Sequence, residues 1–445
     1  MDEGFTPRNL RRVWDLQTRR GRDLSTLYPD VARTIRQARD QRRLIRRLAG
    51  DLGTSPYDPV TAHTSLKELR QQTEDKLEIA LTATSLELAH RLERGTFTWG
   101  LQRVKVASTS RSIYSIGGNS ARYFAEKQLQ RNVAALVPKR QQSRNAIVRA
   151  VAVSLGDALP KAVLKVDVEQ FYESIPHSEL RELVCGAGLT PTSVRLILML
   201  IDEYAALTGA KTGLPTGVGL SAKLAELYIQ AVDRQLSNGD DVIYYARFVD
   251  DIVVVRGLTR SGPRTKSAFL QEPGDALAAI GLTAHPTKSD AHMSGVKGAV
   301  PAFDLLGYEI SRGPKQVEVR LSQPRLVELQ RRLDRTFELW DACDQSNGGR
   351  QLLFLNRVRM LTGNTRLSNN KRNAMVGIYY SNSESTQPDQ FDDLDIALQD
   401  KLSNRTLPVP VGRAIARLSF RGGFEQKTMH RFSADQLRQI RGAWR

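Results

Sequence analysis

The sequence predicts an α+β protein in which an antiparallel sheet lies between helical regions, and three observations support this class. Apolar residues follow a helical spacing before about residue 110 and again after about residue 313. Between these regions, Ala162 to Val168 is a nearly continuous apolar run, which is typical of a central strand. Val242 to Val255 contains two β-prone runs around a reversal, which is typical of a hairpin.

The composition is that of a soluble globular protein with an unusual charge. The 445 residues include 65 Lys and Arg against 48 Asp and Glu, a formal net charge of +17. The excess is spread along the chain, which favours a polyanionic partner such as nucleic acid. No apolar run is long enough to span a bilayer, and two cysteines are too few for a disulfide scaffold. We therefore expect a cytoplasmic protein without membrane association.

The first 115 residues are predicted to form a basic helical extension. Thr6-Pro7 is a typical helix start, and apolar residues at helical spacing follow it. The many arginines around these positions fit either a solvated helix face or a surface that grips nucleic acid. A second basic cluster follows, at Arg122, Lys127, Arg131, Lys139, Arg140, Arg144 and Arg149.

The middle of the chain alternates helices with punctuated loops. Arg144 to Val148 is the expected start of a helix, and Thr190-Pro191 is expected to begin another that runs through Ile201. Gly213 to Ser221 is a loop rich in Gly and Pro, and the segment Ala222 to Ile229 after it is expected to be helical. A Gly-rich loop alone is weak evidence of function.

Three aspartates stand where the predicted strands end. Asp167 closes the apolar run, and Asp250 and Asp251 lie in the reversal of the hairpin. Ionised carboxylates are costly beside buried strands unless a partner neutralises them. No Lys or Arg lies within the turn, so a divalent cation is the candidate partner; a solvated Asp-Asp turn is the alternative. If both segments belong to one antiparallel sheet, three carboxylates meet and hold two ions, an arrangement suited to phosphoryl transfer.

Two other polar clusters have simpler interpretations. Asp389 to Asp395 stand where a helix is predicted to begin, and helix-dipole and N-cap stabilisation explains them; a second catalytic acid site is the alternative. His285 and His292, around Asp290, match no strong metal-ligand spacing and are interpreted as loop residues.

Five segments, in order, resemble motifs of the reverse transcriptases. Val166 to Ile175 resembles the first palm motif, an aspartate with an aromatic residue five positions later. Gly213 to Glu226 resembles the second motif, and Phe248 to Asp251 the paired-aspartate motif. Lys288 falls in the lysine motif, and Leu305 to Tyr308 resembles the primer-grip strand. One such motif is weak evidence, whereas five in family order are specific.

The resemblance implies a right-hand polymerase fold. Fingers and an antiparallel-sheet palm are expected over 116–312, a helical thumb over 313–445, and the basic extension over 1–115. The implied activity is that of an RNA-directed DNA polymerase, which adds deoxynucleotides to a 3′-hydroxyl by two-metal-ion phosphoryl transfer. The implied cofactor is Mg²⁺, as two ions, with Mn²⁺ as the alternative. The implied partners are an RNA template, a DNA primer or product, and deoxynucleoside triphosphates.

The family's residue roles carry over by position. The metal-binding set is Asp167, Val168, Asp250 and Asp251. The three aspartates are also the catalytic set, together with Lys288, which is expected at the leaving phosphate; a plain surface lysine is the alternative. The nucleotide-binding set consists of Val168, Phe171, Tyr172, Lys139, Arg140, Arg144, Pro215, Thr216 and Gly217.

Within the nucleotide set, two assignments stay open. Tyr172 is expected to pack on the sugar and exclude a 2′-hydroxyl, but it competes with Phe171 beside it and a core role is the alternative. Arg144, with Lys139 or Arg140 as alternates, is expected to hold the triphosphate from the fingers. A solvated arginine at a helix start is the competing interpretation of Arg144.

The subfamily is inferred from the basic N-terminus, from Thr216 and from the tail segments Leu361 to Leu367 and Gly377 to Asn382. Thr216 stands where many relatives have glutamine, so the contact that the glutamine side chain makes in those relatives is not expected here. These features look most like the bacterial defence-associated reverse transcriptases, and closest to the smaller polymerase of the two-polymerase, type three system. That resemblance implies a dedicated non-coding RNA as template, a second reverse transcriptase subunit, a higher oligomer and antiphage immunity. The alternatives are a retron-type or group II intron-derived polymerase and, from a different class, a catalytically inactive RNA-binding scaffold.

Overall fold

The chain forms two compact units, each built from two separate segments. Unit 1 consists of Met1–Pro138 and Tyr172–Tyr228, and unit 2 consists of Lys139–Phe171 and Ile229–Arg445. These units divide the chain at other points than the three consecutive parts expected from the sequence. The computed structural model describes residues 3–24, 26–48, 59–104, 112–138, 142–258, 265–295, 298–313, 315–367 and 374–444. Lys139 and Arg140 lie outside the described residues.

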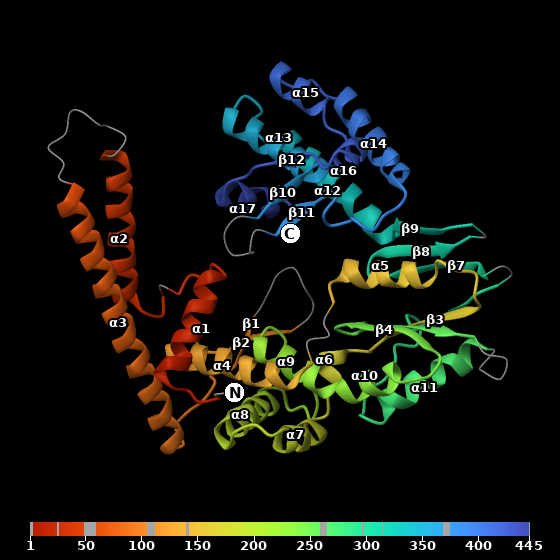
Figure 1. The fold of residues 1–445 in the computed structure, drawn as a ribbon. Helices are drawn as coiled ribbons and strands as arrows, with labels where there is room; N and C mark the ends of the chain where they lie inside the picture. Colours follow the sequence, from red (N-terminus) through yellow and green to blue (C-terminus); the bar gives the residue numbers. More distant parts are fainter. Residues whose placement is uncertain are drawn as a thin grey trace. The chain divides into compact units, whose positions relative to one another are not determined.

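Unit 1 is largely helical, as its apolar spacing predicts. The Thr6 hydroxyl caps the first helix by accepting a hydrogen bond from the Asn9 N–H at 3.4 Å, and Leu10 and Trp14 of that helix are buried. Figure 1 shows α2 and α3 as two long helices that run side by side. The elements are α1 (Pro7–Arg19), α2 (Pro29–Leu48), α3 (Pro59–Glu93), β1 (Gln102–Val104), β2 (Ile113–Ser115), α4 (Ser120–Leu136), α7 (His177–Gly186), α8 (Pro191–Thr208) and α9 (Gly219–Tyr228).

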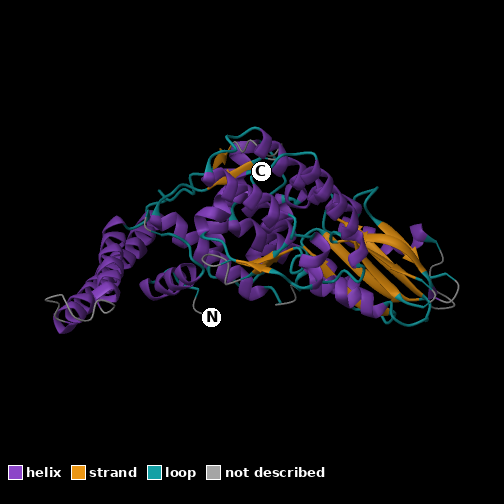
Figure 2. Ribbon diagram, turned by 90° about the horizontal axis from the view of Figure 1, so that it is seen from above, coloured by secondary structure: helices purple, strands orange, loops and turns teal. Residues whose placement is uncertain are grey.

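The first part of unit 2 contains two antiparallel sheets. One has the strand order β4-β5-β3-β6 and the other β7-β8-β9, and Figure 2 shows their strands gathered in one region. The expectation that the apolar run and the hairpin share one antiparallel sheet is confirmed, because β3 pairs with β5. The elements are α5 (Arg144–Ser154), β3 (Lys161–Asp167), α10 (Gln230–Ser237), β4 (Val242–Phe248), β5 (Asp251–Gly257), α11 (Lys266–Ala278), β6 (Asp290–Met293), β7 (Val300–Leu305), β8 (Tyr308–Arg312) and β9 (Val317–Leu321). The short helix α6 (Phe171–Ser174) spans the boundary between the units.

Two local expectations need correction in this region. Leu305 to Tyr308, expected as part of one strand, is the tip of a hairpin, because Leu306 and Gly307 both have positive φ, 51° and 81°. Positive φ at both central residues is the pattern of a type I′ turn, whose twist matches that of antiparallel strands. His292 is not a loop residue either: it lies in β6, where its ring stacks on Phe303 with centroids 4.9 Å apart.

The C-terminal part of unit 2 is mainly helical. Leu333, Phe337 and Trp340 form the buried face of α12, as their spacing predicts, whereas Leu326 and Leu329 are only partly buried. A small sheet of order β11-β10-β12, with β10 and β12 parallel, was not predicted. The elements are α12 (Gln323–Asp341), α13 (Gly348–Thr362), β10 (Asn364–Arg366), β11 (Met375–Gly377), η2 (Pro388–Phe391), α14 (Asp392–Ser403), α15 (Val409–Ile415), α16 (Phe420–Glu425), β12 (Met429–His430) and α17 (Ala434–Gly442). Across the described ranges, no helix has both the length and the apolarity needed to cross a bilayer.

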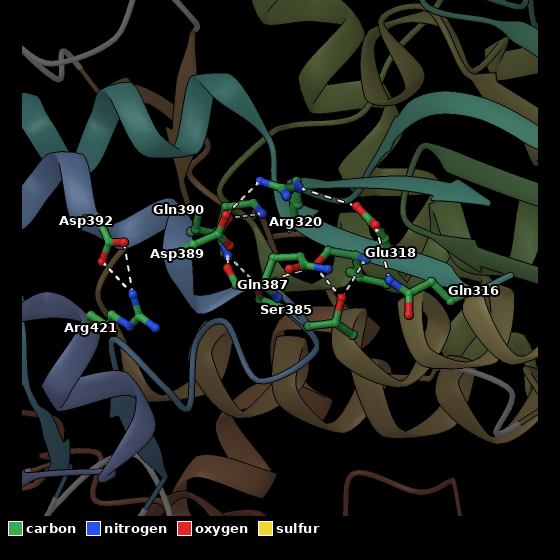
Figure 3. Close-up of polar contacts among 12 residues, drawn as sticks. Gln316, Glu318, Arg320, Ser385, Gln387, Asp389, Gln390, Asp392 and Arg421 are labelled. Atoms are coloured by element: carbon green, nitrogen blue, oxygen red, sulfur yellow. Dashed lines mark hydrogen bonds and ion pairs between the residues drawn. The ribbon is translucent and has the colours of Figure 1, made fainter. Parts of the chain in front are cut away.

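The acid cluster near residue 392 stabilises this helical region. Asp392 and Asp395 lie in the first turn of α14, where the helix dipole favours them. Asp392 also pairs with Arg421 at 2.9 Å, and Asp389 lies 3.6 Å from Arg320 of β9 (Figure 3). Asp395 accepts the Phe420 N–H at 2.6 Å, at the start of α16. The interpretation of the cluster as a helix start is therefore confirmed.

Candidate active site

The three aspartates come together at one end of the four-stranded sheet. Asp167, the last residue of β3, is the direct cross-strand partner of Asp251, the first residue of β5. Asp250 precedes Asp251 in the two-residue turn that joins β4 to β5. The Val168 N–H donates to the Asp250 carbonyl at 3.0 Å, so a backbone hydrogen bond joins the residue after β3 to this turn. The fold thus places carboxylates from two distant segments beside one another.

The turn that carries Asp250 is strained. Val249 has a φ of 63°, in the left-handed region that a β-branched residue rarely adopts. It occupies the first central position of the two-residue turn, where type II′ turns place glycine. A residue held in such a conformation costs about 1–3 kcal/mol and persists only where the surrounding structure imposes it.

A largely buried ion pair, Arg247 with Asp233, holds the turn by a hydrogen bond to the Val249 carbonyl. The Arg247 guanidinium donates to both oxygens of Asp233 in α10, at 2.8 and 3.0 Å, and to the Val249 carbonyl at 2.9 Å. The Tyr245 hydroxyl donates to Asp233 at 2.5 Å. Burial first, and the Asp233 charge second, raise the pKa of Tyr245, so its hydroxyl stays protonated. This ion pair was not predicted from the sequence. The feature that could have indicated it is Arg247, a charged residue inside the otherwise largely apolar strand β4.

The segment before β6 holds Asp167 on its other side. The Asp167 N–H donates to the Ser289 hydroxyl at 3.2 Å, and the Asp167 carbonyl accepts the His285 N–H at 2.7 Å. The same segment brings the Lys288 ammonium to 3.6 Å from an Asp167 carboxylate oxygen. The Lys288 side chain is 58% exposed, so this pair alone contributes about 0–1 kcal/mol to stability.

Burial and the neighbouring carboxylates both raise the pKa of Asp251. Burial, then the charges of Asp250 and Asp167, raise its pKa from 3.8 to about 6. Lys165 and Lys288 act in the opposite direction but do not cancel the effect. The site therefore carries more negative charge than its own lysines neutralise.

This donor set fits Mg²⁺ in its chemistry. Within the described ranges, no group of three or more His, Cys, Asp and Glu side chains forms a ready-made metal site. Mg²⁺ does not require one, because it is commonly bound by one or two carboxylates and completes its shell with phosphate oxygens and water. The hard carboxylate oxygens of the three aspartates, and the cost of burying their negative charges together, are the features that such a cation would satisfy.

The two aromatic candidates for the sugar contact differ in burial. Phe171, in unit 2, is 3% exposed and belongs to the core. Tyr172, the first residue of the second segment of unit 1, is only half-buried, and its carbonyl accepts the Leu214 N–H at 2.8 Å. Tyr172 is thus the member of the pair with a side chain accessible to a ligand.

The loop from Gly213 to Gly217 is held within unit 1 by backbone contacts. Pro215 is buried, and its carbonyl accepts the Ser221 hydroxyl at 2.9 Å. The Thr216 carbonyl accepts the Tyr114 N–H of β2 at 2.7 Å. Gly217 has a φ of 103°, and a Cβ there would lie 2.7 Å from the Tyr114 carbonyl oxygen. The loop therefore approaches β2 more closely than any side chain at 217 permits.

Arg144 begins α5 as predicted, with the Ser143 hydroxyl accepting the Ala146 N–H at 3.2 Å. Its guanidinium donates to the Ser381 carbonyl at 2.9 Å and lies over the Tyr308 ring, 5.7 Å from the centroid. These contacts place Arg144 beside the β7–β8 hairpin, and no described contact joins it to the aspartates.

Comparison with known proteins assigns the central part of the chain. Residues 122–310 match the family model described as reverse transcriptase (RNA-dependent DNA polymerase). The matched segment includes all three aspartates and ends within β8. No match is found among the curated proteins.

Proposed function

We propose that this chain, an RNA-directed DNA polymerase by virtue of its reverse transcriptase domain, extends a 3′-hydroxyl by two-metal-ion phosphoryl transfer at Asp167, Asp250 and Asp251. The observation that carries the proposal is the register of β3 and β5, which makes Asp167 and Asp251 direct partners beside Asp250. Enzymes of this class use an RNA template, a DNA primer and deoxynucleoside triphosphates.

In this proposal the protein's main task is to hold the oxygen donors in place. Asp167 and Asp250 are the principal ligands of two Mg²⁺ ions, with Asp251 and Val168 completing the set; Mn²⁺ is the alternative ion. When bound, the ions neutralise charge on the attacking and leaving oxygens. Lys288 is assigned to the leaving phosphate, and the 3.6 Å between its ammonium and Asp167 supports that role.

The polymerase assignment is tested by RNA-templated primer extension with the purified full-length chain and Mg²⁺. Asp250→Asn is expected to lower the rate by about 100-fold or more, because the substitution removes an ion ligand. Asp240→Asn is the matched control, since Asp240 is an exposed aspartate just before β4. Full extension activity in Asp250→Asn would contradict the proposal.

We further propose that the template is a dedicated non-coding RNA gripped in part by α2. All seven arginines of α2 are exposed, and only two of them have a described carboxylate partner, each at 3.5 Å. A row of such cations along one helix suits the phosphates of a folded RNA. The arginines are Arg33, Arg36, Arg39, Arg42, Arg43, Arg46 and Arg47.

Sequencing the nucleic acid that co-purifies with the chain tests the template proposal. One abundant small RNA, lost when the α2 arginines are replaced by glutamine, is the expected result. Heterogeneous cellular RNA, unaffected by those substitutions, would contradict it.

The biological role we propose is antiphage defence. We propose that the chain acts there with a second reverse transcriptase subunit, in a higher oligomer. Its support is the resemblance of the basic N-terminus, Thr216 and the tail segments to the defence-associated enzymes. Phage infection of cells that carry the complete system is the test. Asp250→Asn is expected to abolish protection and Asp240→Asn to preserve it; equal protection by both variants would contradict a role for DNA synthesis.

A further inference from the structure

A cavity lined by several arginines lies in the C-terminal part of unit 2. It has a volume of about 710 Å³ and is lined by residues of α12, α13, β11 and α17. Four arginines, Arg144, Arg325, Arg332 and Arg441, contribute to its wall, and Glu328 is the one carboxylate among its described lining residues. None of the three aspartates lines it. A cavity of this volume accommodates a ligand the size of a nucleotide.

Two of these arginines converge on the same acceptors. Arg144 and Arg325 each donate to the Ser381 carbonyl, at 2.9 and 2.6 Å. Both guanidiniums also lie over the Tyr308 ring, 5.7 and 5.6 Å from its centroid. A Cβ added at Gly307 would lie 3.1 Å from Arg325 Nη1, a tight contact, so glycine leaves room for the Arg325 guanidinium. The fold therefore holds two like charges together at the cavity wall.

The described part of the chain gives this pair no carboxylate counter-charge. Glu328 is occupied elsewhere, since it accepts hydrogen bonds from Arg331 and Arg332, both at 2.7 Å. Burial, and then the charge of Arg144, lower the pKa of Arg325 to about 10. A phosphate group is the ligand best suited to neutralise the two positive charges of this pair. Its oxygens match the geometry of the arginine N–H donors.

The rest of the cavity suits a base and a sugar. Leu329, Met360 and Ile378 supply an apolar wall, and the Trp444 indole lines the same space. The cavity also includes Ser322, the N-cap of α12, whose side chain makes no capping hydrogen bond. Ser322 and Pro324 thus place the N-terminal end of α12, where the helix dipole favours an anion, at the wall of this cavity.

We propose that this cavity is a second nucleotide-binding site, in which Arg144 and Arg325 hold a phosphate and Trp444 packs on a base. The ligand class is a nucleoside phosphate, either a free nucleotide or one nucleotide of a bound strand. Since the cavity's charge is supplied by arginines, binding there needs no divalent ion. The site is additional to the polymerase site, and its occupancy is measured without catalysis.

The test is equilibrium binding in EDTA to full-length Asp250→Asn protein, which excludes metal-dependent binding at the aspartates. The probes are radiolabelled deoxyadenosine monophosphate and a short single-stranded DNA. Arg325→Gln is expected to weaken binding about 10-fold or more, and Arg325→Lys to restore part of it. Arg331→Gln is the matched control, because Arg331 lies on the same helix, is exposed, and does not line the cavity. If Arg325→Gln does not fold, Arg441→Gln, on the exposed side of the cavity, replaces it.

The two probes distinguish the sources of the nucleotide. Loss of monophosphate binding in Arg325→Gln assigns the site to a free nucleotide, and loss of oligonucleotide binding alone assigns it to a bound strand. The proposal is overturned if neither probe depends on Arg325, or if Arg331→Gln weakens binding equally. Neither result bears on primer extension, which uses Mg²⁺ and the aspartates.

Discussion

Asp167 and Asp251 face each other directly across the antiparallel strands β3 and β5. Side chains of such partners lie on the same face of a sheet, and like charges in this position destabilise it. The structure adds Asp250 beside them and raises the pKa of Asp251 to about 6. A divalent cation bound between these carboxylates, as proposed above, would offset that cost.

Asp251 is expected to make stability depend on pH in the absence of metal. The pKa of Asp251 in the folded state is about 6, above the ordinary 3.8. Its contribution to the free energy of unfolding is therefore fully present below about pH 4 and is lost as the pH rises through 6. Asp251→Asn should remove this loss and be more stable than the wild type at about pH 8. Urea denaturation in EDTA at about pH 5 and pH 8 measures the effect. A difference between the two proteins that is the same at both pH values would contradict it.

Arg247 is expected to act as a positioning residue. Arg247→Lys keeps the charge but loses the fork that joins Asp233 to the Val249 carbonyl, and should cost roughly 1–3 kcal/mol of stability. The turn that carries Asp250 should then be misplaced, so that kcat for extension falls more than the KM for nucleotide rises. Urea denaturation and extension kinetics provide the measurements. Arg234→Lys, an exposed change in α10, is the control, and equal behaviour of the two variants would refute the role.

Gly217 is expected to tolerate no side chain. Gly217→Ala forces a Cβ to 2.7 Å from the Tyr114 carbonyl oxygen at a φ of 103°, and should destabilise the protein by about 1–3 kcal/mol. Gly186→Ala is the matched control: Gly186 is the exposed last residue of α7 with open space around it, so alanine should be neutral or stabilise by up to about 0.5 kcal/mol. Thermal unfolding should therefore shift clearly downward for Gly217→Ala only, and an equal downward shift in both variants would contradict the argument.

Tyr172 is expected to control sugar selection, because Phe171 is buried in the core. Tyr172→Val should raise incorporation of ribonucleotides relative to deoxynucleotides by about 10-fold or more, the scale set by removing a steric contact. Phe171→Val should instead lower stability and leave the ratio unchanged. Primer extension with matched ribo- and deoxynucleotides checks both. A change of selectivity in the Phe171 variant alone would reverse the assignment.

Features with a local cause were predictable from the sequence. The Thr6 cap, the start of α5 at Arg144, and the apolar strand that ends at Asp167 depend on neighbouring residues. The convergence of Asp167 with the hairpin was also predictable, because two buried strands in one antiparallel sheet bring their ends together. The two short parallel strands around Thr365 and His430 were not, since two or three residues carry no periodic signal.

The supporting contacts of the site were beyond sequence reasoning for a different reason. Arg247 and Asp233 lie on separate elements, and only the packing of α10 against β4 shows that they pair. The sequence argument considered only charges within the turn at Asp250 and Asp251, whereas Arg247 lies just before it in β4. Arg144 illustrates the same limit, because its position at a helix start was local information whereas its contact with Tyr308 is tertiary.

The central claim is that Asp167 and Asp250 share divalent ions, and anomalous diffraction from Mn²⁺ tests it most directly. Crystals of the full-length chain with primer, RNA template, a non-reactive nucleotide analogue and Mn²⁺ should show anomalous density between the carboxylates of Asp167 and Asp250. Ions bound elsewhere, with both carboxylates free of metal in the presence of nucleotide, would contradict the account.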